Sequence, residues 1–557
     1  MSTQEKPPPN AKQAAQASWL ALVVIVLAQM QMAFNVNAIP VSVGPIVEDL
    51  NTAATNVGTA LVVYSLFVAA FVMIGAKLGK IFGARLVFQI TALGHGAAMA
   101  LMAFSTDVLM MNIAQAIAGI AAAALVPTLV VLIAANYHGR QQSQALGILA
   151  GTPAISGALA FFIAGYLGTA LSWRYSFGIL FFLSLVVFGL SFRLQPVARQ
   201  AGTRIDTIGA ILSAVAVLLL IFGFNNLLNW GIVLAKPAAP FTLLGLSPAL
   251  LFVVIGLMLF QAFFAWSHRR VKLGEKPLLA LEVIDSPQER SAIIALLVIG
   301  ALGPAVNFLI PLYIQIVQGQ TSLFTSVVVI PYTLAIATAA ILIVRFYDRL
   351  TPRQIAVFAF IAVSVGLTLL AFTIRGEWGT PIAILALIIL GLGEGSLLTL
   401  LFNVMVSESP KELAGDVGAL RGVANNSSTA LGTAFASIAS VGFLTLIVTT
   451  SLAQSAIPNS LKVQINLDNI DFVTNDQLQT VLGETTDATP EQVAETVRIN
   501  TDARLRALKA SFLILASFAL LAIFPALGLP DYSPGEIPID GSPKTGRNNR
   551  KKKRPPT

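Results

Sequence analysis

Long apolar runs without a charged side chain constrain the fold of this 557-residue chain more than any other feature. Because backbone amides have no water to bind inside a bilayer, a run of about 20 such residues or more predicts a spanning helix. Barrel strands would alternate apolar and polar residues, and these runs do not. The clearest charge-free runs are 86–106, 108–139, 207–235, 237–267, 291–344, 354–374, 422–461 and 510–530.

Apolar runs bounded by charged residues, Gly or Pro predict an all-α integral membrane protein with fourteen spans in a six, two and six arrangement. The first run follows a polar, Pro-containing start, and its length predicts a retained helix rather than a cleaved signal. The predicted spans are 19–43, 57–76, 86–105, 108–135, 143–168, 175–192, 207–229, 240–267, 291–316, 322–344, 354–374, 380–406, 420–450 and 508–530. The units expected from them are a tail at 1–18, a six-helix bundle at 19–195, two inserted spanners at 204–268, a linker at 269–290, a second bundle at 291–530 and a basic tail at 531–557.

Lys and Arg positions test this count independently of hydropathy, because cytoplasmic loops carry an excess of both. Short loops of one parity hold only Arg174, Lys236 and Arg375. The pattern predicts a multi-pass protein of the cell (inner) membrane with both termini cytoplasmic. It also explains the net charge of +8 without a nucleic-acid partner. Loops of the other parity hold Lys77, Lys80, Arg85, Arg140, Arg193, Arg199, Arg204, Arg269, Arg270, Lys272, Lys276, Arg290, Arg345, Arg349, Arg353 and Lys411.

One long polar loop, 451–506, is rich in acidic residues and lies on the side opposite the basic loops. Within it Thr489 and Gln492 have the spacing of a capping box, and Pro490 stands at the first helical position. We expect a short exposed helix there, leading into the last spanner.

Two loops at equivalent places in the two six-helix blocks share a basic residue five positions after their first residue. The first runs from Lys80 to Arg85 and includes Gly83, and the second runs from Asp348 to Arg353. Both follow the second spanner of their block. Paired bundles of this kind allow one half to rock against the other around a midplane site.

With these features the sequence resembles the major facilitator superfamily, and within it the fourteen-spanner drug:proton antiporters. The resemblance implies two six-helix bundles with two extra central helices, and alternating-access transport. The segments that match the family in order are Ser172-Trp173-Arg174 after the fifth span, Arg204 to Gly209 at the seventh, Lys276 to Leu279 before the ninth, and Pro311 to Gln315 within it.

The chain departs from the family where that family carries charge in its first bundle. Lys80 stands where the family has an Asp, and Gln115 stands where its fourth helix has an Arg. Its first helix commonly has an Asp about nine positions before a Pro; counting back from Pro45 gives Val36, which lies between two asparagines. The usual proton-handling charges of the first bundle are therefore missing.

Glu394 is the clearest ionisable group inside a predicted span, within the sequence Gly391-Leu392-Gly393-Glu394-Gly395. A charged group at mid-membrane costs about 2.5–3.5 kcal/mol on insertion scales, so such residues are functional candidates. Its carboxyl group is the main proton-coupling candidate. The alternative is a structural hydrogen bond to a neighbouring helix. Asp416 and Arg421 form a secondary coupling pair, for which an interfacial ion pair is the alternative.

Uncharged polar residues within spans supply the candidates for substrate contact. Asn35 and Asn37 lie about 200° apart on a helix, so one is expected to pack against protein and the other to face the cavity. His95 is a further titratable group, for which a packed, hydrogen-bonded role is the alternative. The substrate-cavity candidates are Gln31, Asn35, Asn37, Tyr64, Gln115, Asn307, Gln315 and Asn403.

The paired loops supply the candidates for a conformational gate: Lys80, Gly83, Arg85, Asp348 and Arg353. Because Lys80 reverses the sign of the family's Asp, we expect the balance between inward and outward states to depend more on Asp348 than on Lys80.

Absent motifs narrow the function further. The chain has no Cys and only three distant His, so no metal is expected, and it has no Walker A sequence or hydrolase motif. We therefore expect a monomeric, cofactor-free transporter rather than an enzyme. It would export small amphipathic molecules, driven by an ion gradient, with protons as the expected coupling ion. The alternatives are a same-fold carrier of a lipid, metabolite or inorganic ion, and an uncoupled facilitator or sensor.

Overall fold

A computed structural model describes residues 18–137, 139–197, 199, 205–347, 349–375, 381–408, 414–455, 457, 472, 474–485 and 488–531. Within these residues fourteen helices are long and apolar enough to span a membrane, as the hydropathy pattern predicts. The first six are α1 (Leu20–Val41), α3 (Ala54–Phe82), α4 (Ala84–Ala103), α5 (Val108–Asn136), α6 (Gly139–Ala170) and α7 (Arg174–Ser191), with the short α2 (Val43–Asp49) after α1.

The next two spans are α8 (Thr207–Asn225) and α10 (Pro248–Lys272), separated by the short α9 (Leu227–Trp230). The last six are α11 (Pro287–Pro311), α12 (Ser322–Leu342), α13 (Pro352–Thr373), α14 (Pro381–Glu408), α15 (Ala414–Gln454) and α18 (Pro490–Leu521). Shorter elements are η1 (Leu281–Ile284), η2 (Leu312–Val317), η3 (Ile343–Phe346), α17 (Asn475–Thr485) and α19 (Ile523–Leu527).

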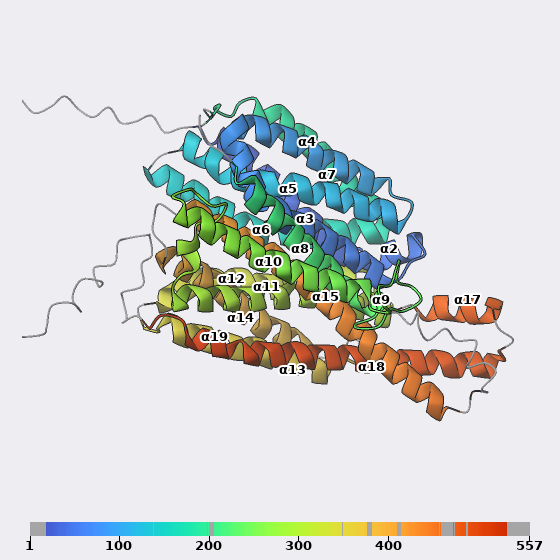
Figure 1. Cartoon of the computed structure of the whole chain (residues 1–557). Coiled ribbons are helices and arrows are strands. Elements are labelled where there is room, and N and C mark those ends of the chain that lie inside the picture. Colours follow the sequence, from blue (N-terminus) through green and yellow to red (C-terminus); the bar gives the residue numbers. More distant parts are fainter. Residues whose placement is uncertain are drawn as a thin grey trace, which may run out of the picture.

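The first and last six spans form two groups joined along two seams, where α3 packs against α15 and α6 packs against α12. The inserted helices α8 and α10 pack on each other, and α8 also contacts α3 and α15. Figure 1 shows them in green between the blue first group and the yellow-to-red last group. The inserted pair therefore lies beside the seam between α3 and α15.

Small residues allow the helices of the first group to approach closely. A Cβ atom at Gly119 of α5 would lie 2.4 Å from the carbonyl oxygen of Tyr64 on α3, and one at Gly75 would lie 2.3 Å from that of Ala123. Neither position can accept a side chain without moving a backbone. In lipid, where burial of apolar surface does not drive helices together, such close packing is a main source of association.

The two membrane ends of the molecule differ in charge. The end that holds the turn between α3 and α4, with Lys80 and Arg85, is here called the basic face, and the other end is called the opposite face. Tyr137 Oη donates a hydrogen bond to the carbonyl oxygen of Ser18 (2.9 Å), and Arg353 pairs with Asp531 (3.5 Å). Both ends of the described chain therefore lie at the basic face.

The helix start predicted from the capping box at Thr489 is confirmed, but the helix that begins there is longer than the short one expected. The Thr489–Gln492 capping box is present, but α18 continues unbroken from Pro490 through the last span. At 1.5 Å per residue, the 41 residues of α15 extend about 60 Å, well beyond the hydrocarbon core. Figure 1 shows these two helices and α17 reaching past the other helix ends.

The eighth span also begins later than predicted, at Pro248 instead of residue 240. Ser247 caps the helix by accepting a hydrogen bond from the backbone N–H of Ala249 (3.2 Å), and Pro248 follows at the first helical position. The apolar stretch before it makes turns and isolated bridges, such as Leu234 to Leu246. Hydropathy alone cannot distinguish an apolar segment that belongs to a spanning helix from one that forms turns before it.

The Ser-Trp-Arg turn before α7 binds neighbouring helix ends at the opposite face. The Trp173 indole N–H and the Arg174 guanidinium both bind the carboxylate of Asp49 at the end of α2. Arg174 also donates to the carbonyl oxygen of Ser105 (2.7 Å). The turn therefore ties α2, α4 and α7 together at their ends.

Candidate functional site

Glu394 is buried in the second group of helices, where α11, α12 and α14 meet. Its side chain is only 7% exposed, and Tyr332 of α12 donates a hydrogen bond to its Oε2 atom. A Cβ atom at Gly303 of α11 would lie 2.0 Å from Glu394 Oε1, so the absence of a side chain there makes room for the carboxyl group. The ion pairs found among the described residues all lie elsewhere.

The glycines around Glu394 fix its position by close packing of α14. A Cβ atom at Gly391 would lie 2.6 Å from the carbonyl oxygen of Tyr332, and one at Gly395 would lie 2.2 Å from that of Ile336. Gly393 lies against the backbone of α13 in the same way. This backbone contact holds Tyr332 and Glu394 in register. Tyr332 was not among the residues predicted from the sequence, where its signal is a hydroxyl group next to Pro331 within a span.

The first group contains a buried network of uncharged polar side chains. Asn35 of α1 and Gln115 of α5 exchange two amide hydrogen bonds, of 2.9 and 3.1 Å. One turn earlier on α1, Gln31 Nε2 lies 2.6 Å from His95 Nδ1 of α4. All four side chains are fully buried. Among the described residues, His95 Nε2 and Gln31 Oε1 have no hydrogen-bond partner.

In the Asn35–Gln115 pair, Gln115 stands where the family that the sequence resembles has an Arg. Counting back from Pro45 pointed to Val36, but the side chain that meets Gln115 is that of Asn35, one position earlier. Two amides satisfy each other without net charge, whereas a buried Asp–Arg pair must overcome the desolvation of both ions. Asn37 turns away, donates to the carbonyl oxygen of Ala33 (2.7 Å) and lies beside Gly157 of α6.

Because the pair is neutral and buried, a single charge introduced into it is expected to destabilise the protein strongly. Asn35→Asp should cost about 3–5 kcal/mol, the typical price of an unpaired buried charge. Adding Gln115→Arg should recover a large part of that loss. Thermal unfolding of the purified single and double variants measures both effects. Equal stability of the single variant and the wild type would show that the new carboxyl group is protonated or reached by water.

At the opposite face, Gln315 joins the two groups. Its Oε1 atom accepts a hydrogen bond from the backbone N–H of Gly44 (2.7 Å), and its Nε2 atom donates to the carbonyl oxygen of Val41 (3.0 Å). Gln315 lies in η2, a π-helical segment that follows Pro311 and changes the direction of the side chains on this helix. Gln315 was predicted to line the substrate cavity, and in the structure it lies in the seam between the groups.

The contact between α6 and α12 adds further hydrogen bonds that join the two groups. The backbone N–H of Leu323 donates to Thr169 Oγ1 (3.1 Å), and the Ser326 hydroxyl donates to the carbonyl oxygen of Phe161. We call this set, together with Gln315, the opposite-face seal. All of these hydrogen bonds cross between the first and last six helices.

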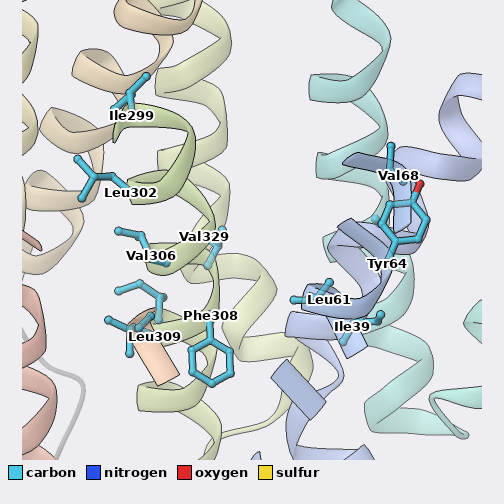
Figure 2. Close-up of a cluster of buried hydrophobic side chains, with 14 of the residues drawn as sticks. Ile39, Leu61, Tyr64, Val68, Ile299, Leu302, Val306, Phe308, Leu309 and Val329 are labelled. Atoms are coloured by element: carbon cyan, nitrogen blue, oxygen red, sulfur yellow. The ribbon is translucent and has the colours of Figure 1, made fainter. Parts of the chain in front are cut away.

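Apolar side chains fill the contact between the groups further in. Phe308 of α11 packs against Gly58 of α3, where a Cβ atom would lie 2.6 Å from the ring. Figure 2 shows the side chains of α1 and α3 opposite those of α11 and α12: Ile39, Leu61, Tyr64 and Val68 on one side, and Ile299, Leu302, Val306, Phe308, Leu309 and Val329 on the other.

The remaining predicted site residues are spread over the bundle. Asn307 is half-buried on α11, and Asn403 of α14 donates to Tyr347 Oη (3.0 Å). Arg421 of α15 is exposed, with its guanidinium 3.8 Å from the centre of the Phe402 ring. The backbone of Asp416 belongs to α15, but its side chain lies outside the described part of the chain, as does all of Asp348.

Comparison with known proteins agrees with this architecture. Residues 25–433 match the family model of the Major Facilitator Superfamily. The chain belongs to this superfamily. Its activity class is therefore transport across a membrane, and not enzymatic catalysis. A bacterial homolog of the human lysosomal transporter Spinster, solved in an inward-facing, unoccupied conformation, shares the fold with a TM-score of 0.60 at 13% identity, over 91% of this chain and 97% of that one.

Similar superfamily members include proteins named for resistance and efflux. The puromycin resistance protein pur8 of Streptomyces alboniger is 26% identical over 437 residues, covering 76% of this chain and 82% of that protein. The multidrug efflux pump LfrA of Mycolicibacterium smegmatis is 25% identical over 438 residues, covering 78% and 83%. The tetracenomycin C resistance and export protein of Streptomyces glaucescens is 24% identical over 423 residues, covering 75% and 74%.

Proposed function

We propose that this transporter exports small amphipathic compounds in exchange for protons. The observation that carries the proposal is Glu394, a buried carboxyl group inside the membrane, held by the Tyr332 hydroxyl. Among the described residues no cation pairs with it. Such a group can bind a proton or balance the charge of a cargo. The names of its relatives, which refer to resistance and export, support the direction of transport.

The proposed mechanism is alternating access between residues 19–195 and 291–530, which rock about the apolar contact of Figure 2. In the conformation described here, the opposite-face seal holds the groups together at one end. The half-buried polar residues Asn37, Asn307 and Asn403 are proposed to contact the cargo. The Lys and Arg distribution supports placing the basic face in the cytoplasm, with the protein in the inner membrane.

The second candidate function is uncoupled transport, in which cargo crosses without an ion. The neutral Asn35–Gln115 pair favours it, because it replaces the charges on which the first bundle of the resembling family depends. Even so, loss of charge in one bundle leaves Glu394 in the other able to exchange protons. We therefore rank coupled export first.

Proteoliposomes distinguish the two candidates. With an acidic lumen, an antiporter should accumulate a permanently cationic amphipathic dye inside, because protons that leave drive the dye inward. Such a dye cannot be trapped merely by protonation. In K⁺ buffer, nigericin exchanges protons for K⁺ and removes the pH gradient without creating a membrane potential, so it should abolish the accumulation. Dye that only equilibrates, with or without the pH gradient, would establish the uncoupled alternative. If the dye moved no faster than in protein-free liposomes, permanently cationic amphipathic dyes would be excluded as cargo.

A further inference from the structure

A pocket of about 260 Å³ lies at the basic face, between the turn that joins α3 to α4 and the segment that follows α7. Gly83 forms the turn with φ = +96°, a conformation that side-chain-bearing residues rarely adopt, and a Cβ atom there would lie 3.3 Å from the carbonyl oxygen of Val197. The lining residues are Phe82, Gly83, Arg85, Leu86, Gln89, Pro196, Val197 and Arg199.

Two arginines bring positive charge to this pocket. Arg85 is oriented from one side, because its Nη2 atom donates to the carbonyl oxygen of Phe192 (2.8 Å) and its guanidinium lies 5.8 Å from the centre of the Phe192 ring. Arg199 approaches Gly83 from the other side, with its Cγ atom 3.9 Å from the position of a Cβ there. The ion pairs found in the described part of the chain involve neither arginine.

The sequence around the pocket supplies no acid to neutralise these charges. Between residues 50 and 205 the single acidic residue is Asp107, which caps α5 at the opposite face by accepting from the backbone N–H of Met110 (2.8 Å). The loop position at which the resembling family has an Asp is Lys80. Basic residues of the same stretch at the basic face are Lys77, Lys80, Arg85, Arg140, Arg193 and Arg199.

Apart from Gln89, the side chains in the rest of the lining are apolar, and two of them reach the outside of the helix bundle. Phe82 is 51% exposed and Leu86 is 43% exposed, although both lie at the membrane end of their helices. Pro196 and Val197 complete the apolar wall. A ligand that fits this lining has an anionic head for the arginines and an apolar chain for the rim.

We propose that this pocket binds the phosphate group of an anionic phospholipid from the leaflet at the basic face. The phosphate accepts hydrogen bonds from Arg85 and Arg199, and the acyl chains lie along Phe82 and Leu86. The lipid supplies the negative charge that the chain lacks at this turn. It thereby links the α3–α4 turn to the segment after α7, within the first group of helices.

The test is lipid binding to the purified full-length protein, measured by native mass spectrometry and by thermal unfolding. Phosphatidylglycerol should bind more tightly than phosphatidylcholine with the same acyl chains, and only the former should raise the unfolding temperature. Arg199→Gln should weaken phosphatidylglycerol binding about fivefold, and the double variant with Arg85→Gln about 25-fold, at the usual energy per basic residue near a membrane. Arg345→Gln, an exposed arginine outside the pocket, is the matched control and should have no effect.

Several results would overturn the proposal. Equal binding of the two lipids would show that the site does not recognise the negative charge of the headgroup. Unchanged binding in Arg199→Gln would place the lipid elsewhere. Inorganic phosphate is a separate arm, and full stabilisation by phosphate alone would identify a free-anion site instead of a lipid site. Arg199→Gln changes an exposed side chain, so it provides a folded test even if the double variant is unstable.

Discussion

Glu394→Gln is expected to abolish proton movement evoked by the cargo, while the protein still folds and binds the dye. The amide has nearly the shape of the carboxyl group and can still accept a hydrogen bond from Tyr332, but it cannot release a proton. The measurement uses proteoliposomes with a pH-sensitive dye in the lumen. Adding the amphipathic cation outside should evoke lumenal alkalinisation in the wild type and none in the variant.

Asp107→Asn is the matched control, because it makes the same acid-to-amide change in a helix cap at the opposite face. Its proton signal should stay close to that of the wild type. If Glu394→Gln kept its full proton signal, Glu394 would be a structural residue and the coupling group would lie elsewhere. Loss of the signal in both variants would point to a general defect in folding or insertion, which thermal unfolding would detect.

The number and order of the spanning helices could be predicted from the sequence, because the membrane forces every apolar run of sufficient length into a helix. The same reasoning gave a wrong assignment outside the membrane, where water can bind the backbone amides. Residues beyond Thr450 and before Leu508 are polar and were assigned to a loop, with only a short helix expected from the capping box at Thr489, yet α15 and α18 extend into this region as long helices. Hydropathy reports which residues lie in lipid and does not report whether a polar segment continues a helix.

The candidate site was only partly predictable, since helix rotation and register decide which side chains meet. Glu394 was visible as an acid within a span, but its partner Tyr332 depends on how α12 packs against the glycines of α14. Asn35 and Gln115 were both named as candidates, but their pairing could not be derived from spacing along the chain. Gln315 was assigned to the cavity as a polar residue within a span. Its actual place in the seam depends on a π-helical segment that redirects its side chain, which regular helical periodicity does not predict.

A disulfide across the opposite-face seal is expected to stop transport reversibly. A Cβ atom at Gly168 of α6 would lie 3.7 Å from the Cβ atom of Ser322 on α12, within the range of about 3.5–4.5 Å found in disulfides. The chain has no cysteine, so Gly168→Cys with Ser322→Cys gives a single possible pair. Under the proposed mechanism the seal must open in every cycle. Oxidation should therefore reduce dye transport to the protein-free level, and a reducing agent should restore it.

A second cysteine pair with the same Cβ–Cβ distance is a control. It distinguishes locking of the opposite-face seal from the general effect of introducing a disulfide. A Cβ atom at Gly94 of α4 would lie 3.7 Å from that of Ala121 on α5, and both helices belong to the first group. Gly94→Cys with Ala121→Cys should cross-link equally well and leave transport almost unchanged, because no relative motion of the two groups is blocked. If the oxidised Gly168–Ser322 pair transported at the reduced rate, the seal would be a permanent contact, and cargo would have to cross without the proposed opening at this end.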